Sequence, residues 1–494
     1  MLFNSLQFLI FFPIVTIIYF LLPFRYRWLH LLIASCIFYM AFVPIYIVIL
    51  FATIIIDYFA GIMIEKSAGR KRKLYLIASL VANIGVLAVF KYYNFFADNV
   101  NTLLASIHIT TTQVPLLKIL LPIGLSFHTF QAMSYTIEVY RGRHKAERHF
   151  GIYALYVMFY PQLVAGPIER PQNVLYQFHE EKFFNYNNAV SGLRLMMWGM
   201  FKKVVIADRL TELTDPVFNH PHNYPPITLA LATVFFAFQI YCDFSGYSDI
   251  ALGSARVMGF KLMKNFNRPY VAKSISEFWS RWHISLSTWF RDYLYISLGG
   301  NRVSVPRWFF NLFFVFLVSG FWHGANWTFI VWGALHGLYL IGAILVNKAK
   351  VKWFGASPAK EKSAFDNALN IAITFILVSV AWVFFRANTI HDAFYIVGRF
   401  PHVFSDIVRI VKTRDVEFMN IWDIQEFITI KRLMFAFLLI FLMEFLQFAQ
   451  EKFNIVKMLY SRPIYFRWLM YYSVIYAIIT YGVFKNHQFI YFQF

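Results

Sequence analysis

The segment 321–327, which reads FWHGANW, places His323 between two apolar runs at 308–321 and 328–346. The first run has fourteen residues, which as a helix cover roughly 21 Å, less than the roughly 30 Å of a bilayer's hydrocarbon core. We therefore expect His323 to lie within the membrane. Ionisable side chains at that depth are costly and mark functional sites that face a protein interior or a water-filled cavity. The alternative is a histidine whose polar atoms are satisfied inside an apolar core.

A second stretch whose residues could take part in chemistry lies at 276–296. Three tryptophans, two arginines and His283 fall within 279–291. Such a segment could not lie in bulk lipid without partners. In one interpretation Arg281 and Arg291 bind an anionic donor through bidentate contacts, with His283 near the reacting centre. In the other, tryptophan and arginine anchor the chain in the headgroup zone. Both interpretations remain open at this point.

A polar cluster at 241–250 follows an apolar run and contains Asp243, Ser245 and Asp249. These groups could line a polar cavity or orient the second nitrogen of a histidine. Alternatively, Ser248 or Asp249 could cap a helix that begins at the next residues, because serine and aspartate are preferred at that position. We expect capping for Asp249 and leave both interpretations open for Asp243.

The composition predicts an all-α, polytopic membrane protein, because 59% of the 494 residues are hydrophobic and only 14% are charged. The net charge of +20 could suggest a nucleic-acid partner. However, lysine and arginine cluster in loops between apolar runs, which the positive-inside rule explains more simply. The two cysteines, Cys36 and Cys242, match no metal or redox spacing. We therefore expect a bilayer as partner, no nucleic acid and no metal at the site.

Apolar runs of suitable length predict about 11 or 12 transmembrane helices, together with re-entrant and interfacial helices around a central funnel or tunnel. Basic loops set the orientation, since lysine and arginine favour the cytoplasmic side. The loops expected inside are 25–27, 65–73, 141–148 and 347–362, and those expected outside are 98–113, the proline-rich loop 211–226 and the mixed-charge segment 386–430. The short run 152–165 is predicted to be re-entrant or interfacial. There is no internal repeat, which removes the usual sequence sign of a secondary transporter.

Several motifs of this chain resemble those of membrane-bound O-acyltransferases. They are DFSG at 243–246, NFNRPY at 265–270, RWHISLS at 281–287 and WHG at 322–324. More closely, TWFRDYLYISLGGNR at 288–302 and FIYFQF at 489–494 resemble the branch that includes the membrane subunit of bacterial alginate O-acetyltransferase. The similarity covers nearly the whole chain, so we expect one integral membrane domain at 1–494 with its core motifs at about 120–346. His128 departs from the pattern, since similar sequences carry an aromatic residue there.

The resemblance implies that His323 is the catalytic histidine and His283 a second active-site residue. It also implies a tunnel joining the two faces of the bacterial cytoplasmic (inner) membrane. Through it, an acetyl group from a cytoplasmic thioester, acetyl-CoA or another acyl donor, would reach a secreted or anchored hydrolase-like relay protein. That protein would place the group on an extracytoplasmic polysaccharide such as alginate, and no bound cofactor is expected. The residues expected to line the tunnel or contact the donor are Arg281, Arg291, Trp282, Trp322, Asp243, Ser245, Asn326 and His336.

For the chemistry, we expect His323 to act as a general base that removes the proton from the incoming hydroxyl, because neutral imidazole suits that role near working pH. His283 would orient the donor or polarise its carbonyl, and a covalent acyl-histidine step stays an open alternative. A rival function is a transporter or flippase for a lipid-linked saccharide. A second rival is a haem or metal protein using both histidines as ligands, although their spacing of forty residues fits no short ligand motif.

Overall fold

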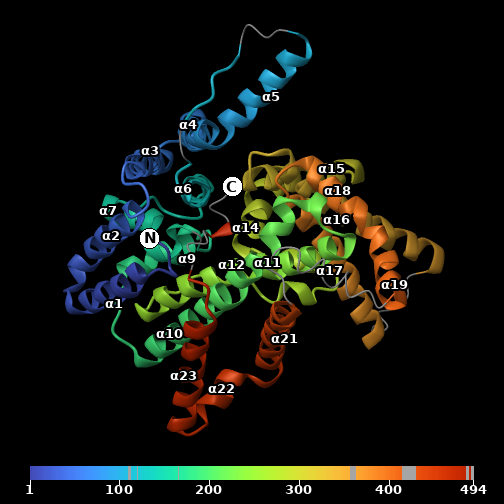
Figure 1. Ribbon diagram of the computed structural model, residues 1–494. Coiled ribbons are helices and arrows are strands. Elements are labelled where there is room, and N and C mark those ends of the chain that lie inside the picture. Colours follow the sequence, from blue (N-terminus) through green and yellow to red (C-terminus); the bar gives the residue numbers. More distant parts are fainter. Residues whose placement is uncertain are drawn as a thin grey trace.

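The computed structural model describes residues 1–108, 113–118, 121–164, 166–355, 363–413, 430–484 and 489–490, and within these ranges the chain forms helices and no strand (Figure 1). The first part of the chain contains α1 (Leu6–Leu21), α2 (Phe24–Met40), α3 (Tyr46–Lys66), α4 (Gly69–Leu87), η1 (Ala88–Tyr92), α5 (Tyr93–Ser106), α6 (Leu125–Tyr140), α7 (Phe150–Met158) and α8 (Tyr160–Leu163). The middle part contains α9 (Pro171–Val174), η2 (Leu175–His179), α10 (Tyr186–Met200), η3 (Phe201–Ala207), α11 (Asp208–Asn219), η4 (Pro221–Asn223) and α12 (Pro226–Val257).

The second half begins with short helices and continues with long ones. These are η5 (Pro269–Val271), α13 (Ile275–Arg281), α14 (Ile284–Trp289), η6 (Phe290–Tyr295), α15 (Val305–His323), α16 (Trp327–Phe354), α17 (Ala364–Arg386), α18 (Ile390–Arg399), η7 (Phe400–His402), α19 (Val403–Thr413), α21 (Ile430–Phe453), α22 (Ile455–Tyr460) and α23 (Ile464–Tyr481). In Figure 1 the amino-terminal helices lie on one side of α12, α15 to α19 lie on the other, and α21 to α23 project below.

The expected all-helical, multi-pass membrane architecture is confirmed. Within the described ranges seven helices are long and apolar enough to cross a bilayer: Tyr46–Lys66, Gly69–Ser106, Pro226–Val257, Val305–His323, Trp327–Trp353, Ala364–Arg386 and Lys431–Phe453. Other predicted spans form shorter helices, such as α1 and α10, so the helices that meet both criteria are fewer than the 11 or 12 predicted. Large apolar side chains such as Ile17 and Phe441 are exposed on the outer faces, as contact with lipid requires.

Helix α12 forms the centre of the molecule. It has 32 residues and a length of about 48 Å. Of its most apolar 18-residue stretch, 72% is buried inside the protein. Helix α10 packs against it very closely, since a Cβ on Gly199 would lie 2.5 Å from the Gly246 carbonyl oxygen. A Cβ on Gly246 would lie 2.7 Å from the Gly199 carbonyl oxygen. Small residues at both positions therefore let the two backbones meet, as in other membrane helix pairs.

The prediction that Asp249 caps a new helix is wrong, because α12 continues without a break through 241–250 to Val257. The Asp249 carboxylate lies 2.8 Å from the Lys202 ammonium group. Lys202 belongs to η3, a π-helical stretch that presents its lysines to this face of α12. Pairing with these lysines lets a helix carry carboxylates through the interior, where an unpaired charge would be very costly.

The predicted loop 211–226 is also partly wrong, because α11 extends to Asn219. Pro216 lies inside the helix near its end, where the missing N–H removes only one intrahelical bond. The apolar side chains of Leu210, Leu213 and Val217 are buried, and α11 packs against α12. This burial outweighs the local signal of the prolines.

The part of the run 152–165 that the structure describes, 152–164, contains most of α7 and all of α8, and its residues are buried. Irregular backbone at membrane depth is tolerated only when protein or water covers it, and here protein does. The described part of the mixed-charge segment 386–430 forms α18 and α19, which carry apolar and polar faces, while 414–429 lies outside the described residues.

Candidate active site

The hairpin of α15 and α16 fixes the position of His323, which is the last residue of α15. A Cβ on Gly320 would lie 2.2 Å from the Phe329 carbonyl oxygen, and a Cβ on Gly333 would lie 2.3 Å from the Phe316 carbonyl oxygen. The two backbones therefore touch next to His323. The Asn326 side chain accepts a hydrogen bond of 3.0 Å from the Thr328 amide and so caps α16. This predicted tunnel residue therefore acts as a helix cap in the structure.

The end of α15 is held by η1, a π-helical interruption of the α4–α5 helix. The Tyr92 hydroxyl donates to the Phe321 carbonyl at 3.1 Å. The Lys91 ammonium group donates to the carbonyls of Trp322 at 2.7 Å and His323 at 2.9 Å. The last carbonyls of a helix lack intrahelical partners, and a cation is favourable there. Lys91 thus caps the helix that carries His323.

Our sequence analysis missed Lys91. The residue lies within a long apolar helix that qualifies as a membrane span, so it is an intramembrane ionisable residue by the same criterion that selected His323. The signal was therefore present in the sequence. The sequence did not reveal the hydrogen-bond partner of Lys91, since 231 residues separate it from Trp322. π-Helical turns occur frequently at functional sites, and this one brings Lys91 to the end of α15.

The His323 ring lies in an aromatic cage beside a small cavity. The ring centroid is 4.9 Å from Trp332, 5.0 Å from Trp322 and 5.3 Å from Phe385. The cavity has a volume of about 30 Å³ and is lined by residues of η1, the start of α6 and the end of α15, among them Lys91, Ser126, Trp322 and His323. The lining is mixed, but Lys91, Ser126 and His323 supply polar groups, and a cavity of this size with such groups has room for water. A small polar group can therefore lie beside the imidazole.

The backbone of His283 is held in an unusual conformation. The residue precedes α14 with φ 43° and ψ 52°, a left-handed conformation that is rare outside glycine and is often found at active sites. Its neighbours are fixed by the motif at 265–270. The Ile284 amide donates to the Asn265 carbonyl and the Asn267 amide to the Arg281 carbonyl, both at 2.9 Å. The conformation of the RWH segment thus depends on a second segment of the chain.

The structure brings the two predicted catalytic histidines to one place. Trp322 lies beside both, with its ring centroid 5.0 Å from that of His323 and 6.4 Å from that of His283. His283 and His336 are both close enough to His323 to interact with it electrostatically. The His283 ring also packs at 4.7 Å from Phe244 of α12. His323 borders the small cavity, whereas His283 is fully buried and does not line it.

A larger cavity of about 230 Å³ runs along α15. One face of α15 contributes Leu312, Val315, Phe316 and Ser319, and the opposite wall includes Trp279, Ser287 and Arg291. Ser319 precedes His323 by four residues, so about 6 Å along the helix separates their positions. The end of α15 therefore carries one wall of each cavity, the larger at Ser319 and the smaller at His323. The tunnel that the resemblance implies stays a prediction.

Arg291 and Arg281 have different surroundings. The Arg291 side chain is 59% exposed at the rim of the larger cavity and pairs with Asp292 at 2.8 Å. Burial alone would raise the pKa of Asp292, but Arg291 and Arg170 hold that pKa below its usual range. Arg281 pairs with Glu277 at 2.8 Å, donates to the Asn267 carbonyl, and lines neither of the two cavities. Arg291 is therefore the better placed of the two to meet a ligand.

Asp243 and Ser245 belong to a buried ionic network. The Asp243 carboxylate lies 2.7 Å from the Lys203 ammonium and accepts a hydrogen bond of 2.8 Å from the Ile490 amide. The Ser245 hydroxyl accepts from Lys202 at 2.9 Å. Phe489 packs at 5.5 Å from Phe244, the residue whose ring lies against His283. The carboxyl-terminal segment at 489–490 is thus anchored beside the site, which neither interpretation of Asp243 had foreseen.

The remaining predicted residues form the wall of the site. The Trp279 indole donates to Nδ1 of His336 at 3.3 Å, and His336 also packs at 4.9 Å from Trp332. Trp282 packs at 4.9 Å from Trp382. His336 and Trp282 therefore support the aromatic enclosure around His323. His128 is buried in α6 and lines neither cavity.

Glu169, in the loop that precedes α9, carries a buried carboxyl group that gives a pH-dependent prediction. Burial raises the pKa of Glu169 to about 7, although hydrogen bonds from the Met263 amide and Asn173 oppose the shift. Between pH 4.5 and 7 the folded protein holds this proton and the unfolded chain does not, so stability falls as pH rises through this window. We expect Glu169→Gln to remove a penalty of up to about 3 kcal/mol above pH 7. Thermal unfolding in detergent at pH 5 and pH 8 measures it, and an equal stability gain at both pH values would contradict the assignment.

Comparison with known proteins finds a matching family model and several relatives. The model of the MBOAT, membrane-bound O-acyltransferase family, matches residues 143–387, which include both histidines. The chain is 42% identical to the probable alginate O-acetylase AlgI of Pseudomonas aeruginosa, over 80% of this chain and 73% of that protein. It is 38% identical to the peptidoglycan O-acetyltransferase of Helicobacter pylori, over 74% and 72%. It is 31% identical to the teichoic acid D-alanyltransferase of Streptococcus thermophilus, over 53% and 68%.

Proposed function

Because the chain belongs to the membrane-bound O-acyltransferase family and is an O-acyltransferase, we propose that it passes an acetyl group from a cytoplasmic thioester, such as acetyl-CoA, across the membrane. The final acceptor is an extracytoplasmic polysaccharide such as alginate. One observation supports this most strongly: the end of α15 places His323 at a small cavity with a mixed polar and apolar lining and Ser319 at a larger, mainly apolar one. Donor and acceptor can thus approach the same helix end from different cavities.

The donor would enter through the larger cavity. Basic loops favour the cytoplasmic side, and the rim of this cavity carries Arg291 within the basic stretch 256–307. The apolar walls suit the thioester end of the donor. Arg291 is exposed and can meet the anionic part of the donor, because a guanidinium group binds phosphate through paired hydrogen bonds.

In the reaction, His323 accepts the proton of the acceptor hydroxyl while the hydroxyl oxygen attacks the thioester carbonyl carbon. The tetrahedral intermediate then collapses, the carbon–sulfur bond breaks, and the thiolate takes the proton back from the His323 imidazolium. The products are an acetyl ester and a free thiol. His283 orients the donor or polarises its carbonyl. Confinement of both reactants beside one helix end supplies much of the rate gain through effective molarity.

The acceptor side follows from the names of the relatives, which act on alginate, peptidoglycan and teichoic acid. All three are polymers of the cell exterior. A secreted or anchored hydrolase-like protein would take the acetyl group on a serine and deliver it to the polysaccharide. The described part of the segment 386–430, with α18 and α19, is our candidate docking surface for that protein.

The direct test uses purified protein in proteoliposomes with acetyl-CoA labelled in the acetyl group. We expect thiol release that depends on an added hydrolase-like partner, and transfer of the label to a serine of that partner. Movement of a lipid-linked saccharide without thioester cleavage would contradict the proposal. Omission of the partner serves as the control for spontaneous hydrolysis.

Arg291→Ala tests the donor path. We expect the KM for acetyl-CoA to rise about tenfold, the equivalent of one charged contact of about 1.4 kcal/mol, while kcat changes less than about twofold. Initial rates of thiol release measure both constants. Arg302→Ala is the matched control, because Arg302 is exposed in the same basic stretch and does not line the cavity. Equal KM values for the two variants would contradict a role of Arg291 in donor binding.

A further inference from the structure

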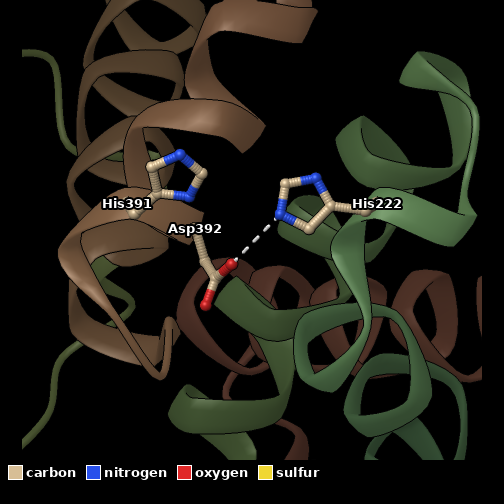
Figure 2. A group of neighbouring side chains, drawn as sticks. All are labelled: His222, His391 and Asp392. Atoms are coloured by element: carbon tan, nitrogen blue, oxygen red, sulfur yellow. Dashed lines mark ion pairs between the residues drawn. The ribbon is translucent and has the colours of Figure 1, made fainter.

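Two histidines and an aspartate meet on the surface where η4 and α18 lie side by side (Figure 2). His222 comes from η4, whereas His391 and Asp392 come from the first turn of α18. One ligand atom of each residue lies within 4.8 Å of the other two. Nε2 of His222 lies 3.4 Å from Oδ1 of Asp392. Figure 2 shows both imidazole rings and the carboxylate directed into the same space.

These distances fit a small transition-metal ion. Bonds of roughly 2.0–2.2 Å in a tetrahedral site place neighbouring ligand atoms about 3.4 Å apart. The separation of His222 and Asp392 already has this value. Both histidines are exposed, so rotation of their side chains can bring the remaining ligand atoms from within 4.8 Å to the same spacing without any change in the core.

The fold orients the carboxylate for this role. The Thr389 hydroxyl donates to Oδ2 of Asp392 at 2.7 Å, and the Asp392 amide donates back to the Thr389 hydroxyl at 3.0 Å. Oδ1 is thereby left facing His222. Partners of this kind, which hold a ligand by its other oxygen, fix the geometry of metal sites. The His222 ring is also positioned, since it packs at 4.0 Å from the ring of Tyr395.

The two segments are held together independently of any metal. Arg386 pairs with Asp215 at 2.7 Å, and the Asn388 amide donates to Asn219 at 3.3 Å. These contacts join the end of α11 to the segment before α18. The three candidate ligands are therefore brought together by the fold itself. This limits the entropy lost when a metal binds.

We propose that His222, His391 and Asp392 bind one divalent transition-metal ion of the zinc type, with a fourth position open to water. Two imidazole nitrogens and one carboxylate oxygen favour zinc, copper or nickel over magnesium or calcium, which prefer oxygen ligands throughout. The ion would fasten η4 to the start of α18. None of the three residues lines either cavity at the candidate active site, so binding of the ion does not depend on the proposed function.

The test uses the full-length protein purified in detergent with an affinity tag that contains no histidine. After treatment with a chelator, the protein is dialysed against Zn²⁺ and its metal content is measured by atomic emission. We expect one Zn²⁺ per chain and a visible absorption spectrum with Co²⁺ typical of a tetrahedral site. His222→Ala and His391→Ala should each weaken Zn²⁺ binding at least tenfold. Zn²⁺ should also raise the unfolding temperature of the parent protein but not of either variant.

His402→Ala is the matched control, since His402 is an exposed histidine in η7 outside the cluster. Its Zn²⁺ affinity should equal that of the parent protein. Asp392→Asn keeps a side chain able to bond Thr389 and separates loss of the ligand charge from loss of the helix cap. Equal Zn²⁺ binding by the parent protein and both histidine variants would overturn the proposal, as would absence of bound Zn²⁺. Either result would mean that the cluster is an ion pair of His222 and Asp392 and not a metal site. No acyl donor is present, so these outcomes are separate from those that test acyl transfer.

Discussion

His323→Ala is expected to lower the rate of acetyl transfer by about 10³-fold or more, because the variant lacks the group that accepts the proton of the attacking hydroxyl. The ring lies at the end of α15 and lines the small cavity, and among the residues that the structure describes no other imidazole lines that cavity. The loss should appear in kcat. It is measured as thiol release from acetyl-CoA by equal amounts of purified parent and variant protein in proteoliposomes, with the hydrolase-like partner added.

The matched control is His128→Phe. His128 is a buried histidine of α6 that lines neither cavity, and phenylalanine keeps an aromatic ring of similar shape at this position. We expect this variant to keep most of the activity, and both variants to elute from gel filtration like the parent protein. If His323→Ala retained more than about a tenth of the parental rate, the general-base assignment would be wrong, since such a loss is below the usual range for this role.

The sequence predicted the helical membrane architecture and the position of His323 because both depend on local properties. The length of an apolar run decides whether a helix can cross a bilayer, and an imidazole beside such a run stands out. The resemblance added His283, and the structure places it with His323 around Trp322. Their roles in catalysis stay predictions until the variants are measured.

The features that the sequence did not predict all depend on contacts between distant segments. Asp249 has the local pattern of a helix cap, but Lys202 pairs with it across the α10–α12 interface and the helix continues. Asp243 binds the Ile490 amide, 247 residues away. Arg281 and Arg291 look alike in the sequence, yet only Arg291 lines a cavity. Three-dimensional neighbours decide these cases, and local pattern cannot identify them.

Lys91→Met is the second substitution with a large expected effect. Methionine has a similar length but no hydrogen-bond donor, so the variant loses the bonds to the Trp322 and His323 carbonyls. An unsatisfied buried carbonyl costs about 1–3 kcal/mol, and the end of α15 can relieve that cost by moving. Since this shift would displace the His323 ring, we expect kcat to fall about 100-fold with little change in the KM for acetyl-CoA.

Tyr92→Phe distinguishes a positioning role of Lys91 from a general loss of stability. Tyr92 also bonds the end of α15, but through the Phe321 carbonyl at 3.1 Å, two residues before His323. Its loss should lower the unfolding temperature while kcat falls less than about threefold, because the carbonyls of Trp322 and His323 keep their Lys91 bonds. Thermal unfolding and initial rates are measured on both variants. A similar fall in kcat for Tyr92→Phe and Lys91→Met would mean that any weakening of this helix end impairs catalysis. If kcat falls only in Lys91→Met, and the two variants have comparable thermal stability, the Lys91 ammonium group is the group that positions the His323 imidazole.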